Sequence, residues 1–158
     1  SYNDINYWID GDIDDVKIYS GVLSPSDITD LNSFGDVAGI WSLDEVSGTT
    51  TADISSNAND GMLTSSPTWT TGPDGSGALD FNGTVHVVVG DPAGGELDFG
   101  QDSFSVSVWV KYTATSFHRI VSKGHWNWTK GYFVTTWSNG GLGAGVGYGW
   151  GLYSSSTL

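Results

Sequence analysis

Side-chain oxygens gather in one short stretch of the chain, where Asp53, Asn57, Asn59 and Asp60 follow each other closely. Carboxylate and amide oxygens, with the carbonyls of a bent backbone, are the ligands of which Ca²⁺ takes about six to eight. The same side chains can instead accept backbone N–H bonds and build Asx turns without a metal. The stretch therefore indicates either a calcium loop or a hydrogen-bonded turn, and it is no EF-hand because the Glu at the twelfth position is missing.

A second acidic group lies in the predicted strand 13–19. Strict alternation puts Asp14 on the face of Val16 and Ile18, and it puts Asp15 on the opposite face with Lys17. A carboxylate on a packed face is costly unless a cation, a hydrogen bond or an opposite charge compensates it. We therefore expect one of these two acids to point inward and to need a partner.

Aromatic residues crowd the last third of the chain. Aromatic faces stack on the C–H surfaces of sugars, and nearby Asn and Asp side chains can fix hydroxyls. The alternative is that about half of these rings pack in the core or at sheet edges. The candidate glycan-binding residues are Trp126, Trp128, Trp137, Tyr148 and Trp150.

Two sequons are present, at Asn82 and Asn127. Each Asn is followed two residues later by Thr, which is the acceptor pattern for N-glycosylation in a host and compartment that allow it. Such triplets also arise by chance. The two asparagines are therefore candidate modification sites.

Catalysis has little support in the sequence. Glycoside hydrolysis needs a pair of carboxylates around the bond, and Glu45 and Glu96, the only two Glu, stand in unrelated contexts. The three His residues are scattered as well, and no Gly-x-Ser-x-Gly elbow occurs. We assign no catalytic residue and expect a protein that is not an enzyme.

Composition excludes several classes of partner. The 158 residues carry a formal net charge of −13 and contain no Cys. Nucleic acid and anionic membrane surfaces would repel this charge, and no run of about 18 apolar residues is present that could insert into a membrane. Without Cys there is neither a disulfide nor a thiolate metal site. Asp-rich loops suit an extracellular location, where calcium is plentiful.

These residues must be positioned by strands. Short alternating apolar stretches bounded by Gly, Asn, Asp and Ser indicate an all-β protein, an antiparallel β-sandwich. The one helical pattern begins at Ser24, which can cap it, and Leu23, Ile28 and Leu31 are expected to anchor it to the sheet. The expected strands are 7–9, 13–19, 38–43, 78–81, 85–89, 104–112, 119–123, 132–137, 143–148 and 151–153.

Two parts of the chain resemble laminin-G-like, concanavalin-A-like jelly-roll domains. Gly39-Ile40-Trp41-Ser42-Leu43-Asp44-Glu45 and Gly77-Ala78-Leu79-Asp80-Phe81 resemble the opening half, which continues through 104–112. Ile13-Asp14-Asp15-Val16-Lys17-Ile18-Tyr19 resembles the closing strand. The order is inverted, and the middle hairpin of the family has no counterpart after Gly131, so the sandwich is expected to be incomplete or permuted.

The resemblance implies a division of the chain and a metal site. Residues 1–33 correspond to a closing strand and terminal short helix, 34–37 to a linker, and 38–158 to an opening part. Opening and closing strands are adjacent in this fold, so 13–19 is expected to pair with 38–43. In the family, an acidic loop and the closing-strand Asp meet at a structural Ca²⁺. The implied ligands are Asp14, Asp53, Asn57, Asn59 and Asp60.

Two functions follow as expectations. The first is a non-catalytic extracellular module for adhesion or for surface or filament architecture. Missing strands leave unpaired sheet edges, so the module would associate with other copies or neighbouring repeats by strand complementation. The second is a carbohydrate-binding module of a secreted polysaccharide-degrading enzyme, whose partner is a glycan. Concentration-dependent association and glycan binding distinguish the two.

Overall fold

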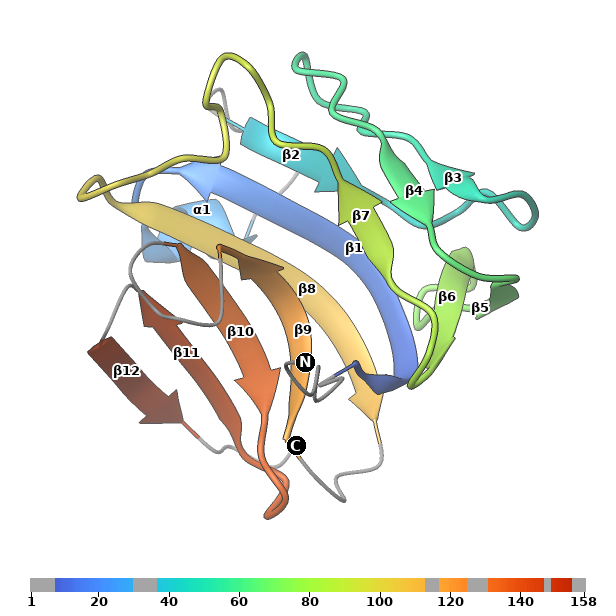
Figure 1. Cartoon of the computed structure of the whole chain (residues 1–158). Helices are drawn as coiled ribbons and strands as arrows, with labels where there is room; N and C mark the ends of the chain where they lie inside the picture. Colours follow the sequence, from blue (N-terminus) through green and yellow to red (C-terminus); the bar gives the residue numbers. More distant parts are fainter. Residues whose placement is uncertain (1–7, 30–36, 113–116, 125–130, 147–148, 155–158) are drawn as a thin grey trace, which may run out of the picture.

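The computed structural model describes residues 8–29, 37–112, 117–124, 131–146 and 149–154. The protein is all-β with antiparallel sheets, so the predicted fold class is confirmed at this level. The elements are β1 (Asp10–Ser20), α1 (Pro25–Thr29), β2 (Val37–Trp41), β3 (Thr50–Thr51), β4 (Gly61–Leu63), β5 (Thr68–Thr71), β6 (Gly77–Asn82), β7 (Val87–Val89), β8 (Phe104–Tyr112), β9 (His118–Lys123), β10 (Tyr132–Thr136), β11 (Leu142–Val146) and β12 (Gly149–Ser154) (Figure 1).

The long strand β1 organises the largest sheet. Its first half pairs with β6, its second half pairs with β2, and β8 runs along its other edge. Val16 lies opposite Trp41, which confirms the expected pairing of the 13–19 strand with the 38–43 strand. Residues on both sides of the predicted linker therefore share one sheet.

Alternation in β8 explains how this sheet faces the core. Phe104, Val106 and Val110 pack against the buried core, as the pattern predicts. Trp109 points the other way and keeps 58% of its surface exposed. The face of β8 that carries Trp109 is therefore the solvent-facing side of this sheet.

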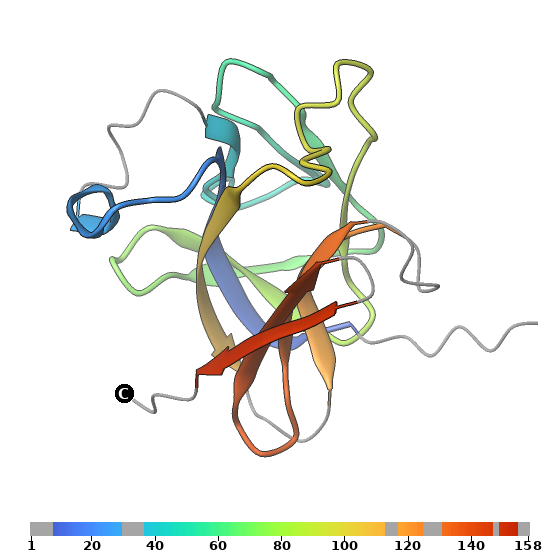
Figure 2. The ribbon, with the colours of Figure 1, turned by 90° about the vertical axis from the view of Figure 1, so that its left-hand side faces the viewer.

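Two smaller sheets complete the structure. One has the order β12-β11-β10-β9, and the other has the order β3-β4-β7 (Figure 2). The short strands β3, β4 and β5 were not predicted, because two to four residues carry no alternating pattern. The predicted strand 7–9 is wrong: Trp8 makes only an isolated bridge to Arg119, and residue 7 lies outside the described residues.

The helix α1 begins where its cap predicts. The Asp27 N–H donates to Ser24 Oγ at 3.3 Å, and the Ser24 N–H donates to Asp27 Oδ2 at 2.7 Å, a reciprocal capping arrangement. Ile28 does not anchor the helix, because it is 60% exposed. Leu31 lies outside the described residues. The attachment comes instead from Ser105, whose Oγ accepts the Leu23 N–H at 3.2 Å.

One core joins the three sheets. It draws on β1, β2 and β6, and on the loop before β8, and the β10 residue Tyr132 packs against the rings of Phe99 and Phe104. In the described part of the chain no helix is long and apolar enough to cross a membrane.

Candidate functional site

A β-bulge in β1 decides where its acids point. Asp15 has a φ of 52°, and the pairing with β8 changes register between Asp14 and Lys17. The bulge reverses the alternation, because a left-handed residue inserts one extra position into the strand. Asp14 lies opposite Trp109 and therefore on the outer face of the sheet. The prediction that Asp14 shares a face with Val16 is wrong for this reason.

Asp14 is nevertheless buried, with 4% of its surface exposed. The turn between β5 and β6 packs on it so tightly that a Cβ on Gly72 would lie 2.2 Å from Asp14 Oδ2. Among the described residues, Asp14 Oδ1 has no hydrogen-bond partner. The Asp14 carboxylate is thus buried under the turn between β5 and β6, although it lies on the outer face of the sheet.

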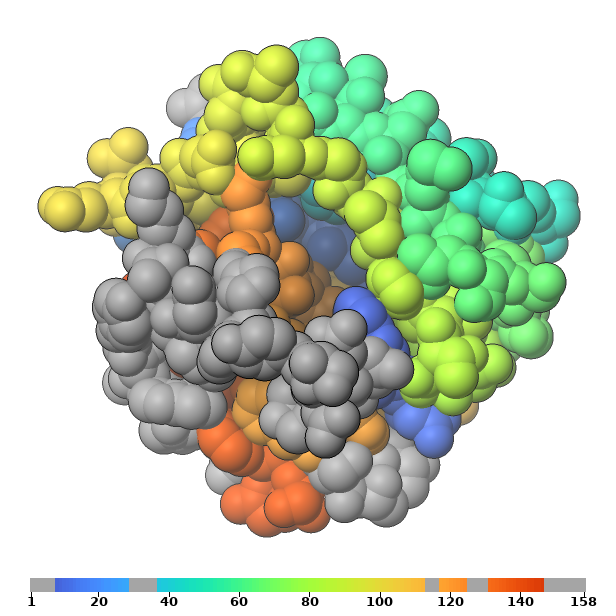
Figure 3. All heavy atoms as spheres, viewed as in Figure 1, coloured from blue at the N-terminus to red at the C-terminus, as the bar shows by residue number. Residues whose placement is uncertain are grey.

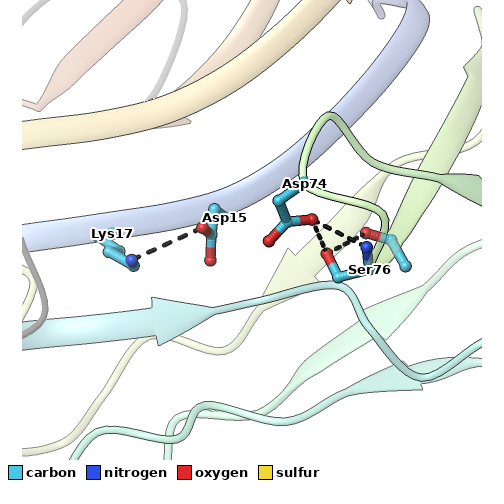
Figure 4. A network of polar contacts seen from close by, with 5 residues as sticks. Asp15, Lys17, Asp74 and Ser76 are labelled. Atoms are coloured by element: carbon cyan, nitrogen blue, oxygen red, sulfur yellow. Dashed lines mark hydrogen bonds and ion pairs between the residues drawn. The ribbon is translucent and has the colours of Figure 1, made fainter.

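Other carboxylates surround Asp14. Burial, and then the charges of Asp15, Asp44 and Asp74, raise the pKa of Asp14 to about 6, although the Asp15 backbone N–H offsets part of the rise. Figure 4 shows how two of these acids are engaged: Asp15 pairs with Lys17 at 3.7 Å, and Asp74 Oδ1 accepts the Ser76 N–H at 2.9 Å. Asp14 therefore carries the least compensated charge of this region.

The acidic loop after β3 is built around Asp53. Its Oδ1 accepts the N–H groups of Ile40 and Ser55, both at 2.9 Å, and its Oδ2 accepts the Asn59 N–H at 2.9 Å. The Asp53 N–H in turn donates to Asp60 Oδ1 at 2.9 Å. Asp53 is 5% exposed, so these bonds compensate its burial. The loop has the geometry of the Asx-turn alternative.

Asn57 and Trp41 tie this loop to β2. Asn57 Nδ2 donates to the carbonyls of Val37 at 3.2 Å and Ala38 at 3.1 Å. Trp41 Nε1 donates to the Asn59 carbonyl at 3.0 Å. The predicted loop residues therefore come together, with most of their polar groups used in hydrogen bonds within the chain.

The acids whose charges raise the pKa of Asp14 are not among the predicted loop ligands. The charges that act on Asp14 come from Asp15, Asp44 and Asp74, and not from Asp53. In the described ranges, no three Asp, Glu or His side chains are placed to hold a metal ion. Calcium at the predicted ligand set stays a prediction.

The predicted glycan residues are placed only in part. Trp126, Trp128 and Tyr148 lie outside the described residues, and Trp150 belongs to β12. Trp137 is half-buried: its ring meets Phe117 edge-on at 5.1 Å. Its Nε1 would lie 2.6 Å from a Cβ on Gly143, so the ring covers β11 closely. Trp137 is thus engaged in packing.

The candidate glycosylation sites also differ in placement. Asn82 is exposed at the end of β6, and its Oδ1 accepts the N–H of Thr84 at 3.0 Å and the Oγ1 hydroxyl of Thr84 at 2.7 Å. Asn127 lies outside the described residues. Modification at either site stays a prediction.

A cavity of about 640 Å³ opens between β7 and β9. Figure 3 shows the hollow, with residues of β1 deep within it and the segment around β7 along one side. No single residue type predicts this cavity. The lining is mainly apolar and includes Ile13, Val16, Ile18, Phe81, Val85 and Leu97.

Side-chain contacts cross the cavity at its two ends, an ion-pair group at one and a stacked ring pair at the other. At one end Lys123 Nζ lies 2.5 Å from Asp91 Oδ1 and 3.0 Å from Asp98 Oδ1. Burial alone would lower the pKa of Lys123, but the hydrogen bonds to the two carboxylates outweigh it and the pKa is raised. At the other end the rings of Trp8 and His86 stack at 3.9 Å.

Comparison with known proteins assigns no family: no family model matches the chain, and no curated protein and no solved structure matches it. The likeness to laminin-G-like domains thus rests on sequence motifs alone.

Proposed function

We propose that this chain is a non-catalytic, extracellular, laminin-G-like β-sandwich module for adhesion or for surface or filament architecture. In this proposal it is a repeated or self-associating unit, stabilised by calcium and completed by a strand from a neighbour. The observation that carries the proposal is the apolar cavity between β7 and β9. In the described part of the chain, β7 pairs only with β4, and β9 pairs with β10 and touches Trp8 at a single bridge.

Open strand edges favour association over other uses of the cavity. An edge presents unpaired N–H and C=O groups, which pair readily with an extended segment of another chain. An apolar lining adds a hydrophobic gain when a partner covers it. The net charge of −13 argues against nucleic acid and acidic surfaces as that partner.

Sedimentation equilibrium tests this function. We expect the weight-average mass to rise with protein concentration, and to rise further with added salt, because salt screens the repulsion between copies of charge −13. A monomer mass at every concentration and salt level would contradict the proposal.

A carbohydrate-binding module is the second candidate, and one observation favours it. Trp109 exposes 58% of its surface on the outer face of β8. Beside it, Lys111 Nζ binds Asp12 Oδ2 at 3.2 Å, so polar groups flank the ring. A glycan array that compares the wild type with Trp109→Ala decides this candidate. Binding that disappears in the variant supports it, and an array without signal removes it.

A further inference from the structure

Strand β8 is the longest outer strand of the largest sheet. It spans nine residues, Phe104–Tyr112, and pairs with β1 on one side. The other outer strands of this sheet, β2 and β5, have five and four residues. In the described part of the chain no strand pairs with the second side of β8, and Figure 1 shows β8 at the border of its sheet. A long free edge of this kind is a template for pairing with another chain.

Hydrogen bonds at the start of β1 show which groups of β8 point toward β1. The Gly83 N–H donates to the Ile9 carbonyl at 2.9 Å, so the backbone of Ile9 faces β6. Antiparallel pairing alternates the two sides from one residue to the next, so Asp12 and Asp14 face the opposite side, which is that of β8. Asp14 lies opposite Trp109. The N–H and C=O groups of Trp109 are therefore turned toward β1.

The second half of β1 gives the same result on the far side of the bulge. The Ile40 carbonyl accepts the Ile54 N–H at 2.9 Å, so the backbone of Ile40 points away from β1. Lys17 lies opposite Ile40 on β2 and opposite Ser107 on β8. Because bonded and non-bonded positions alternate, the backbone of Lys17 faces Ser107. Two independent hydrogen bonds thus assign Ser107 and Trp109 to the β1 side of β8.

Every second residue of β8 therefore presents its backbone at the free edge. The N–H and C=O groups of Val106, Val108 and Val110 point away from β1, because those of Ser107 and Trp109 point toward it. Among the described residues, no backbone hydrogen bond reaches these outward groups. The edge thus offers a row of donors and acceptors in the spacing of an antiparallel partner.

The solvent-facing side of the same strand carries an exposed indole. Trp109 keeps 58% of its surface exposed, and a ring of this size loses apolar contact with water when a partner covers it. The strand also contains no Asp or Glu, although the chain carries 18 of them. Two copies of charge −13 can therefore meet along β8 without carboxylates directly opposite each other.

We propose that β8 pairs antiparallel with β8 of a second copy of this chain, about a two-fold axis at Val108. This inference rests on the proposed function, since it names the surface through which the unit associates. In this register Val108 exchanges both of its backbone hydrogen bonds with the partner's Val108, and Val106 does so with the partner's Val110. All outward groups of the central part of the strand are then paired, and the two large sheets form one continuous sheet.

The same register gives Trp109 a partner. Ser107 lies directly opposite the partner's Trp109, and its small side chain leaves room for the ring. The two Trp109 residues are diagonal neighbours across the axis, about 7–8 Å apart, which aromatic side chains can span. A second copy is favoured over an unrelated segment, because a two-fold contact needs the same backbone groups and the same ring on both sides.

Residue-resolved hydrogen exchange tests the inference on the unmodified protein, at a dilute and an associating concentration. We expect the Val106, Val108 and Val110 amides to exchange at least about tenfold more slowly on association, and the Ser107 and Trp109 amides to exchange equally in both. Association without this protection overturns the inference and leaves the proposed function standing. Full protection in the dilute monomer shows that the chain covers this edge itself, and overturns the inference as well. A chain that never associates contradicts both.

A single cysteine identifies the partner strand, because the chain has no Cys of its own. The Cα atoms of a hydrogen-bonded antiparallel pair lie about 5.5 Å apart, which is within the range of about 4.4–6.8 Å that a disulfide spans. We expect Val108→Cys to form a disulfide-linked dimer on oxidation. Val88→Cys is the control, because Val88 is 48% exposed on β7, outside this contact. Equal yields of dimer from the two variants would show random collision and overturn the inference.

A pair of exposed apolar residues sharpens the test. For Trp109→Ala we expect the dissociation constant of the dimer to rise at least about tenfold, because the ring loses its partner across the axis. Met62→Ala is the matched change, since Met62 is 64% exposed on β4, and we expect a rise below about threefold. Equal effects of the two changes would show that the solvent-facing side of β8 takes no part.

Discussion

Two aspartates with the same burial have opposite surroundings. Asp53 is 5% exposed and accepts three backbone N–H bonds in the loop after β3. Asp14 is 4% exposed, its Oδ1 has no partner among the described residues, and its pKa is raised to about 6. The number of donors within reach, and not the depth of burial, separates a structural carboxylate from a strained one.

Chain topology explains the difference. The Asp53 carboxylate bends its own loop around itself, so Ser55 and Asn59 lie two and six residues away and their N–H groups turn toward it. Asp14 is covered by remote segments that bring Asp44 and Asp74 instead of donors. The first site is therefore expected to be rigid, and the second to respond to pH and to cations.

The largest effect is expected at the loop. Asp53→Ala leaves three N–H groups without acceptors, and we expect a loss of about 3 kcal/mol of unfolding free energy in urea denaturation. Asp53→Asn keeps one acceptor oxygen and should lose about half as much. A loss below about 1 kcal/mol for Asp53→Ala would contradict the assigned role of the loop bonds.

The packing over Asp14 gives the next effect. Gly72→Ala places a Cβ 2.2 Å from Asp14 Oδ2 and 2.9 Å from the Gly77 carbonyl, so backbone has to shift, and we expect a loss of about 2 kcal/mol. Gly90→Ala is the matched control, because nothing lies within 4 Å of its Cβ position. Equal melting midpoints for the two variants would show that the turn is free to move.

Asp14→Asn should stabilise the protein, in the opposite direction to Asp53→Asn. The folded state raises the pKa of Asp14 from 3.8 to about 6, so this carboxyl favours folding while protonated, and that contribution is lost as the pH rises through 6. With chelator present, we expect a gain of about 1 to 2 kcal/mol at pH 8 and none below about pH 4. A difference that does not vary with pH would exclude the titration of Asp14 as its cause.

Removal of calcium is expected to change stability the least, and this effect again concerns Asp14. If a cation compensates Asp14, chelation lowers the melting midpoint by a few degrees, about 1 kcal/mol or less, and we expect this result. The shift should vanish in Asp14→Asn. Identical midpoints with calcium and with chelator contradict structural calcium, and an undiminished shift in the variant places the cation elsewhere.

Much of the fold was predictable from local pattern. The alternation in β8 predicts its core face, and the Ser24 cap predicts where α1 begins, because both depend on residues that are neighbours in the chain. The 13–19 and 38–43 pairing was inferred from the family resemblance and is present. The short strands β3 to β5 carry too few residues for a pattern, so only their partners make them strands.

The acidic loop and the acidic strand show where the sequence stops being sufficient. The sequence alone indicates that Asp53, Asn57, Asn59 and Asp60 form one loop, because these residues are close neighbours in the chain. Tertiary structure decided that Asp14 lies on the outer face, because the bulge at Asp15 reverses a periodicity that sequence takes as regular. It also decided that β7 and β9 face each other across a gap, which depends on contacts between residues more than thirty positions apart.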